Sequence, residues 1–167
     1  MNPEPQAAKG FLARPDLVSA YLLLSLAGFL SVLFLIWTGR LLPGDLTPER
    51  AGLLKAILYA FCFGGLGGTA YSIYGLYKHT SLNDYSPAYF YWYLFRTPLG
   101  AVLGMISYFL IQGGLFAFAQ APAGNTFQAK ALYVSVAFLA GFSVNQFVAK
   151  LKSLSQSLFG VKSHKET

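Results

Sequence analysis

The chain has 167 residues, of which 55% are hydrophobic and only 11% are charged, and its formal net charge is +6. Soluble domains carry about 25% charged residues, so this chain has too few charges to cover a surface that faces water. Its apolar residues also occur in runs of about 20, the length that crosses roughly 30 Å of hydrocarbon. The composition excludes an ordinary soluble domain and indicates an integral membrane protein.

Four apolar segments are long enough to be membrane spans, and they cover about 17–37, 53–77, 93–118 and 131–149. Because hydrocarbon cannot hydrogen-bond a bare backbone, spans of this length must be helices. The predicted fold class is therefore all-α: an integral membrane four-helix bundle with an amphipathic C-terminal helix extension.

This prediction divides the chain into three parts. Residues 1–15 form an N-terminal cytoplasmic segment, 16–151 the four-span domain, and 152–167 an amphipathic, basic cytoplasmic tail. The first span is expected to stay uncleaved, because its apolar run is too long for a signal peptide and no small-residue cleavage site follows it.

Charge and helix-start residues support this organisation. Four spans place both termini on one side, where eight of the 12 Lys and Arg residues lie, so the positive-inside rule predicts cytoplasmic termini in the plasma (inner) membrane. The second helix is expected to begin at Thr47 and Pro48, and the third at Ser86 and Pro87, since Ser or Thr followed by Pro is typical of a helix N-terminus.

Small residues recur at steps of about four within the last three spans. Such stripes let helix backbones approach closely, and this packing drives association in lipid. The predicted helix-packing residues are Ala60, Gly64, Gly65, Gly68, Ser72, Gly100, Gly104, Ser107, Ala137 and Gly141. The glycines of 63–77 do not form a phosphate-binding loop, because no P-loop or dinucleotide motif and no preceding strand is present. Whether the stripes close one chain or meet a neighbouring subunit stays open at this stage.

Polar residues in the cores of the spans are few and uncharged. Gln112 lies late in the third span, and Asn145 and Gln146 lie late in the fourth. Together with Thr69, Ser72 and Ser107 they can line a water-filled path, and the alternative is a set of hydrogen bonds between helices. The favoured interpretation is the hydrogen bonds.

The span cores contain no ionisable pair of the kind that catalysis or proton transfer needs. Intramembrane Asp, Glu or His would mark such a site, and the two histidines, His79 and His164, fall in a loop and in the tail. A lone cysteine, Cys62, excludes a Cys-based metal cluster. We therefore expect no enzyme activity, no metal and no cofactor, with a lipid- or quinone-modifying enzyme as a minor alternative.

Three basic residues are expected to contact lipid headgroups. Arg96 opens the third span and can snorkel to phosphates, bond the carbonyl end of a helix, or pair with Asp84. Lys150 and Lys152 belong to an amphipathic continuation of the fourth helix. This continuation can lie on the inner membrane surface, where anionic lipid attracts lysine, or pack in a small cytoplasmic bundle.

From Tyr93 onward the chain contains four recognisable motifs, "YLFRTPLGAVLG", "IQGGL", "AFLAGFS" and the tail "FVAKLKSLSQSLFG". In these motifs the chain resembles uncharacterised bacterial four-span membrane proteins. This sequence inserts Thr97 into the Arg-Pro pair, and it has Val144 and Asn145 where the pattern has an acidic residue. The resemblance implies a four-span module and no particular activity.

The expected function is that of a non-enzymatic membrane protein that assembles through its small-residue seams. Its expected partners are the bilayer, anionic lipid included, and either copies of itself or other membrane subunits, and no nucleic acid. The alternative function is a small oligomeric channel or pore for an ion or a small neutral solute.

Overall fold

The computed structural model describes residues 15–41, 44, 46–82, 84–86, 89–115 and 127–160. All regular secondary structure in these residues is α-helical, which confirms the predicted all-α class. The helices are α2 (Pro15–Trp37), α3 (Pro48–Ser81), α4 (Tyr89–Gln112), α5 (Phe127–Phe142) and α6 (Val144–Phe159).

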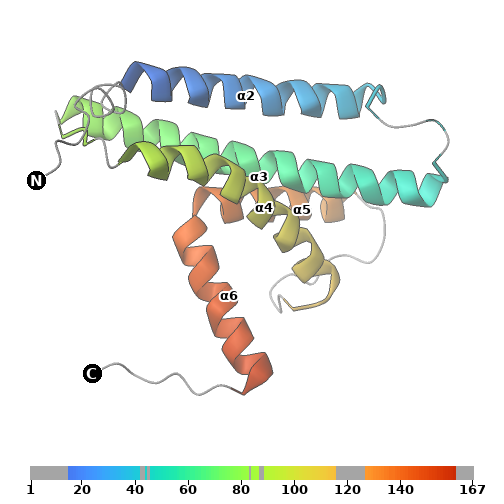
Figure 1. Cartoon of the computed structure of the whole chain (residues 1–167). Helices are drawn as coiled ribbons and strands as arrows, with labels where there is room; N and C mark the ends of the chain where they lie inside the picture. The colour runs from blue at the N-terminus through green and yellow to red at the C-terminus, as the bar shows by residue number, and fades with distance from the viewer. Residues whose placement is uncertain are drawn as a thin grey trace, which may run out of the picture.

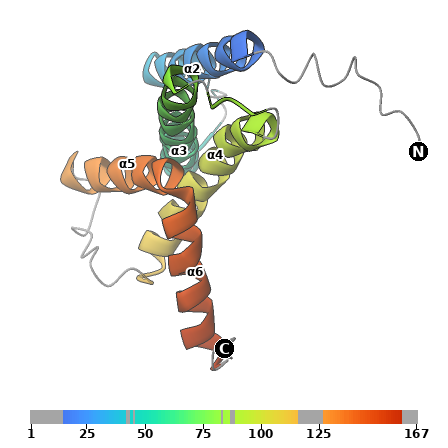
Figure 2. The ribbon, with the colours of Figure 1, turned by 90° about the vertical axis from the view of Figure 1, so that its left-hand side faces the viewer.

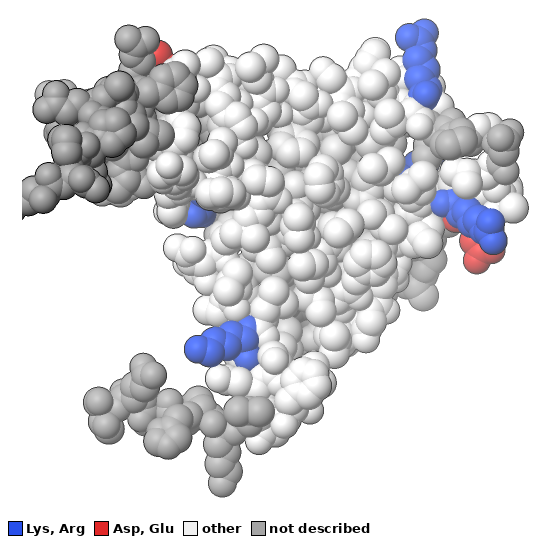
Figure 3. All heavy atoms as spheres, in the orientation of Figure 1, with Lys and Arg blue, Asp and Glu red and all other residues white. Residues whose placement is uncertain are grey.

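Three helices, α2, α3 and α4, are long and apolar enough to cross a membrane, and the bent pair α5–α6 makes a fourth if it is counted as one span. On the face seen in Figure 3, Lys and Arg gather toward the two ends of the long helices and on α6, and a broad, almost uncharged band lies between the ends. This distribution is typical of a helical protein whose middle lies in hydrocarbon.

The longest helix, α3, is the centre of the structure. It packs against α2 on one side and against α4 and α5 on others (Figures 1 and 2). Its start agrees with the prediction, because Thr47 is the N-cap and Pro48 the first helical residue. The Thr47 side chain makes no capping hydrogen bond. The backbone carbonyl of Thr47 accepts a hydrogen bond from the Ala51 N–H at 2.9 Å.

Helix α4 ends earlier than the predicted limit of residue 118. Gly114 adopts a left-handed backbone with φ +70°, and the Leu115 N–H bonds back to the Leu110 carbonyl at 3.0 Å. A glycine in this conformation is a common helix terminator, because it has no Cβ to clash. Residues 116–126 lie outside the described residues.

The prediction of one continuous helix over 131–149 and into the tail is wrong. The axis turns by 106° between α5 and α6, and Ser143 lies at the break. A continuous helix would give the Phe142 carbonyl to the Gln146 N–H, but in this structure that carbonyl accepts a hydrogen bond from Arg96. Residues 144–149 therefore belong to α6.

A cluster of buried side chains joins α2 to the neighbouring ends of α3 and α4. It consists of Val18, Leu22, Leu76 and Tyr93, with Tyr85 packed against it from the segment between α3 and α4. Burial of the Tyr85 hydroxyl raises its pKa. This cluster fixes one end of α2, and the contacts described below fix its middle.

Candidate functional site

The glycine stripe of α3 meets the backbones of α4 and α5. A Cβ placed on Gly64 would overlap the Gly100 carbonyl and would lie 2.7 Å from the Gly104 Cα. From α5, a Cβ on Gly141 would overlap the Gly64 carbonyl. Since real side chains do not approach backbone this closely, only glycine permits the three helices to meet here.

Two neighbouring glycines extend this contact along α3. A Cβ on Gly67 would lie 2.8 Å from the Phe142 N at the end of α5, and one on Gly68 would lie 2.8 Å from the Arg96 carbonyl. Gly65 faces the other way and receives the ring of Phe29 from α2. The glycines of α3 therefore pack against three different helices, α2, α4 and α5.

All ten predicted packing residues are buried, and we call this set with Gly67 the glycine seam. The described contacts of its glycines are with helices of the same chain. The seam glycines therefore pack α3 against α2, α4 and α5 within the chain.

Arg96 is enclosed beside the seam, with 5% of its surface exposed. Its guanidinium carbon lies 3.8 Å from the ring centroid of Tyr71 on α3 and 4.5 Å from that of Trp92 on α4. Its Nη2 donates to the Phe142 carbonyl at 2.9 Å. Two aromatic faces and a carbonyl at the negative end of a helix stabilise the cation.

This placement corrects the expected headgroup contact of Arg96. The guanidinium lies between α3, α4 and the end of α5, so it bonds a helix carbonyl, which was one of the alternatives, and does not extend to the surface. Asp84 was another possible partner of Arg96, but its Oδ2 lies 3.8 Å from His79 Nδ1 instead. Lys150 and Lys152 are exposed on α6, as a headgroup contact requires.

Pro98 creates the polar contact that holds α2 against α4. A proline has no N–H, so the carbonyl four residues earlier, that of Leu94, loses its helical partner. The Tyr21 hydroxyl on α2 donates to this carbonyl at 3.0 Å. A buried carbonyl without a partner would cost about 1–3 kcal/mol, so this bond between helices has a clear stabilising role.

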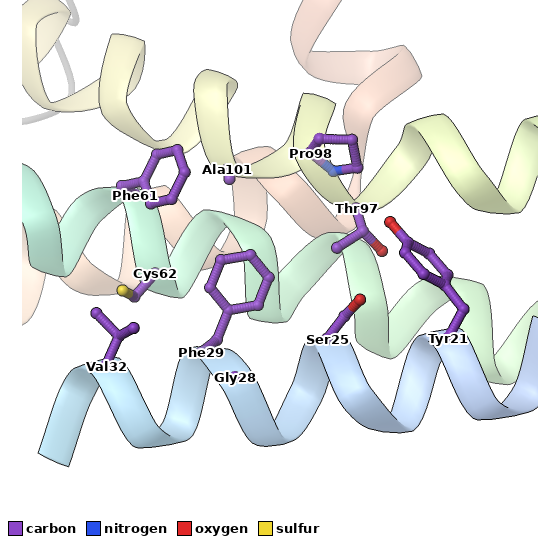
Figure 4. A pocket seen from close by; sticks show the side chains of 10 residues that line it. All are labelled: Tyr21, Ser25, Gly28, Phe29, Val32, Phe61, Cys62, Thr97, Pro98 and Ala101. Atoms are coloured by element: carbon purple, nitrogen blue, oxygen red, sulfur yellow. The ribbon is translucent and has the colours of Figure 1, made fainter.

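A groove of about 380 Å³ lies beside this contact, between α2, α3 and α4. Figure 4 shows Tyr21, Ser25, Phe29 and Val32 of α2 facing the side chains of α3 and α4 across it. The remaining lining residues are Gly28, Phe61, Cys62, Thr97, Pro98 and Ala101. This lining suits an apolar group such as a lipid chain and offers no charge to an ion.

The six residues of the predicted polar path do not form one row, because three are buried (Thr69, Ser72 and Ser107) and three are exposed (Gln112, Asn145 and Gln146). Thr69 is buried and donates to the Gly65 carbonyl, with its hydroxyl 3.3 Å from that of Thr97. Gln112 is exposed and donates to the Tyr108 hydroxyl. Asn145 and Gln146 are exposed on α6. Of the hydrogen bonds expected between helices, the one at Thr69 is present, whereas Gln112 bonds a tyrosine of its own helix.

Three residues of this site were not predicted from the sequence. Tyr21, Tyr71 and Phe142 contact groups that lie far away in sequence, and neither hydropathy nor spacing pairs them. One usable signal was present, since Pro98 within a span leaves a carbonyl that some donor must satisfy.

Comparisons with models of protein families, with curated protein sequences and with solved structures give no match for this chain. The motif resemblance from Tyr93 onward stays an expectation drawn from the residues alone.

Proposed function

We propose that this chain is a non-enzymatic, multi-pass protein of the plasma (inner) membrane that assembles through a face of α2. The assembly is a homo-oligomer or a larger complex with other membrane subunits. One observation carries the proposal: in the apolar 18-residue stretch of each helix, only 11% of the residues of α2 are buried, against 33% for α3 and 50% for α4. A large part of α2 is thus free to meet another helix.

The exposed face of α2 has the composition of a helix-packing surface. Ala20, Ala27 and Ser31 lie on it beside Leu24, and all four are exposed. Small residues between leucines let a second helix approach closely in lipid, where dispersion contacts drive association. Because the glycine seam is used within the chain, this face replaces the seam as the proposed assembly surface.

The centre of the α3–α4–α5 unit supports a structural role. Backbone meets backbone at Gly64, Gly104 and Gly141, so the space along this axis is filled. The proposed orientation keeps both termini in the cytoplasm, as the distribution of Lys and Arg favours.

Disulfide cross-linking in native membranes tests the proposed surface. In a Cys62→Ala background, Leu24→Cys places a thiol on the α2 face, where Leu24 is 73% exposed. Val102→Cys on α4, where the native side chain is 41% exposed, is the matched control. Oxidation is expected to cross-link Leu24→Cys to a second copy, or to a second membrane subunit that carries a thiol, and to leave Val102→Cys unlinked.

The mass of the native particle in mild detergent completes this test. Assembly predicts a protein mass above the 18.2 kDa of one chain. A single-chain mass together with no cross-link at Leu24→Cys would refute assembly through α2.

A further inference from the structure

Helix α6 leaves the packed helices at a fixed angle. It turns by 106° from α5 and runs away from α2 and α3 in both views (Figures 1 and 2). It is 16 residues long and ends at Phe159, where the next residue, Gly160, has a φ of +64° and caps the helix. A helix in this direction runs across the axis of the spans and does not extend them.

Buried contacts set this direction. The Phe142 carbonyl, the last of α5, accepts from the Arg96 guanidinium, and the Phe142 ring packs edge-on against Tyr71 at 5.3 Å between centroids. The first residue of α6, Val144, is buried with Leu103 and Ala140. The chain on both sides of the bend is therefore held by side chains of α3 and α4.

The bend lies close to one end of the apolar band. Phe142 contacts Tyr71, which precedes Lys78 by seven residues, or about 10 Å along a helix axis. Lys78 belongs with the charged boundary at this end of α3. An amphipathic helix on a membrane surface buries its apolar face about 5–10 Å into the boundary between headgroups and acyl chains, so α6 leaves the bundle near the right depth.

The two faces of α6 differ in the way that such a position requires. Phe147, Leu151, Leu154 and Leu158 form one stripe, whose first two members pack toward α4. Leu158 is 61% exposed near the far end of α6. Lys150 and Lys152 flank the stripe on opposite sides, and both are exposed. Leucines on one face of α6, with exposed lysines beside them, match a surface of acyl chains below anionic headgroups.

We propose that α6 lies in the plane of the membrane at the cytoplasmic leaflet, where Lys150 and Lys152 bind the headgroups of anionic phospholipids. The leucine stripe is then immersed in the acyl-chain boundary, and the contact of Arg96 with Phe142 holds the helix in that plane. This inference rests on the proposed membrane insertion and orientation, and it is independent of assembly through α2.

An environment-sensitive fluorophore on the full-length protein tests this placement. In the Cys62→Ala background, the dye is attached at Leu158→Cys on the leucine stripe or at Ser153→Cys on the polar face. The protein is reconstituted in vesicles of phosphatidylcholine with or without phosphatidylglycerol, with a quencher attached to the lipid chains. We expect a blue-shifted emission and strong lipid quenching at Leu158→Cys, and neither effect at Ser153→Cys.

The lysines are tested in the same vesicles. Phosphatidylglycerol is expected to increase lipid quenching at Leu158→Cys, and Lys150→Gln combined with Lys152→Gln is expected to abolish that increase. Equal quenching at the two dye positions would overturn the in-plane placement. A blue shift at Leu158→Cys without lipid quenching would also overturn it, because the stripe would then be packed against protein. If phosphatidylglycerol still increases the lipid quenching after both lysines are replaced, the proposed headgroup contact of Lys150 and Lys152 is overturned.

Helix α2 takes no part in the fluorescence measurement. If Leu24→Cys forms no cross-link but Leu158→Cys is quenched as expected, assembly through α2 is contradicted and the in-plane placement of α6 is not.

Discussion

Gly64→Ala places a methyl group at the centre of the glycine seam. The new Cβ would overlap the Gly100 carbonyl and would lie 2.7 Å from the Gly104 Cα. Both neighbours are backbone atoms, so no side chain can rotate away and the helices must separate. Overpacking costs about 1–3 kcal/mol, and contacts with two helices place this site at the upper end. The better helix propensity of alanine returns at most about 1 kcal/mol. We expect a net destabilisation of about 2 kcal/mol.

Gly52→Ala is the matched control for this change. Gly52 lies in the same helix, and a Cβ there would meet no atom within 4 Å, so the variant keeps the propensity gain and has no clash. Unfolding in mixed micelles, followed by circular dichroism as dodecyl sulfate is added, measures both variants. We expect Gly64→Ala to unfold earlier than the parent and Gly52→Ala to unfold at the same point or later. Equal midpoints for the two variants would refute close backbone packing at Gly64.

Two further predictions concern the contacts that hold α2 and α6. Tyr21→Phe leaves the Leu94 carbonyl of α4 unpaired and should destabilise the protein by about 1–3 kcal/mol in the same titration. Tyr74→Phe, at an exposed position, should not destabilise it. Equal effects of the two changes would argue against the hydrogen bond. Arg96→Lys keeps the charge and loses the planar group that stacks on aromatic rings, so the distance distribution between spin labels at Leu139 and Leu158 should broaden. An unchanged distribution would show that Arg96 does not hold the bend.

The sequence predicted the elements that local pattern determines. Apolar runs located α2, α3 and α4, and Thr47 with Pro48 marked the start of α3 where the structure has it. Spacing by four identified the buried face of α3, because residues four apart share one face of a helix. The same spacing could not identify what covers that face, since it contains no information about the neighbour.

The bend at Ser143 could not be predicted from the sequence for a related reason. The residues on both sides of it have helical patterns, and no proline interrupts them. What ends α5 is a tertiary contact, the hydrogen bond from Arg96 to a carbonyl 46 residues away. The sequence offered three partners for Arg96, among them the carbonyl end of a helix, but only the fold brings Tyr71, Trp92 and Phe142 around it.

Closure of the glycine seam within one chain is the central claim, and the hydroxyls of Thr69 and Thr97 allow a direct test. They lie 3.3 Å apart across α3 and α4, so cysteines at these positions come close to disulfide geometry. The measurement is oxidation of Thr69→Cys combined with Thr97→Cys in a Cys62→Ala background, beside a mixture of the two single variants. Closure within the chain predicts a disulfide in the double variant at the mass of one chain, and no dimer in the mixture. A covalent dimer from the mixed single variants, with no internal disulfide in the double variant, would contradict it.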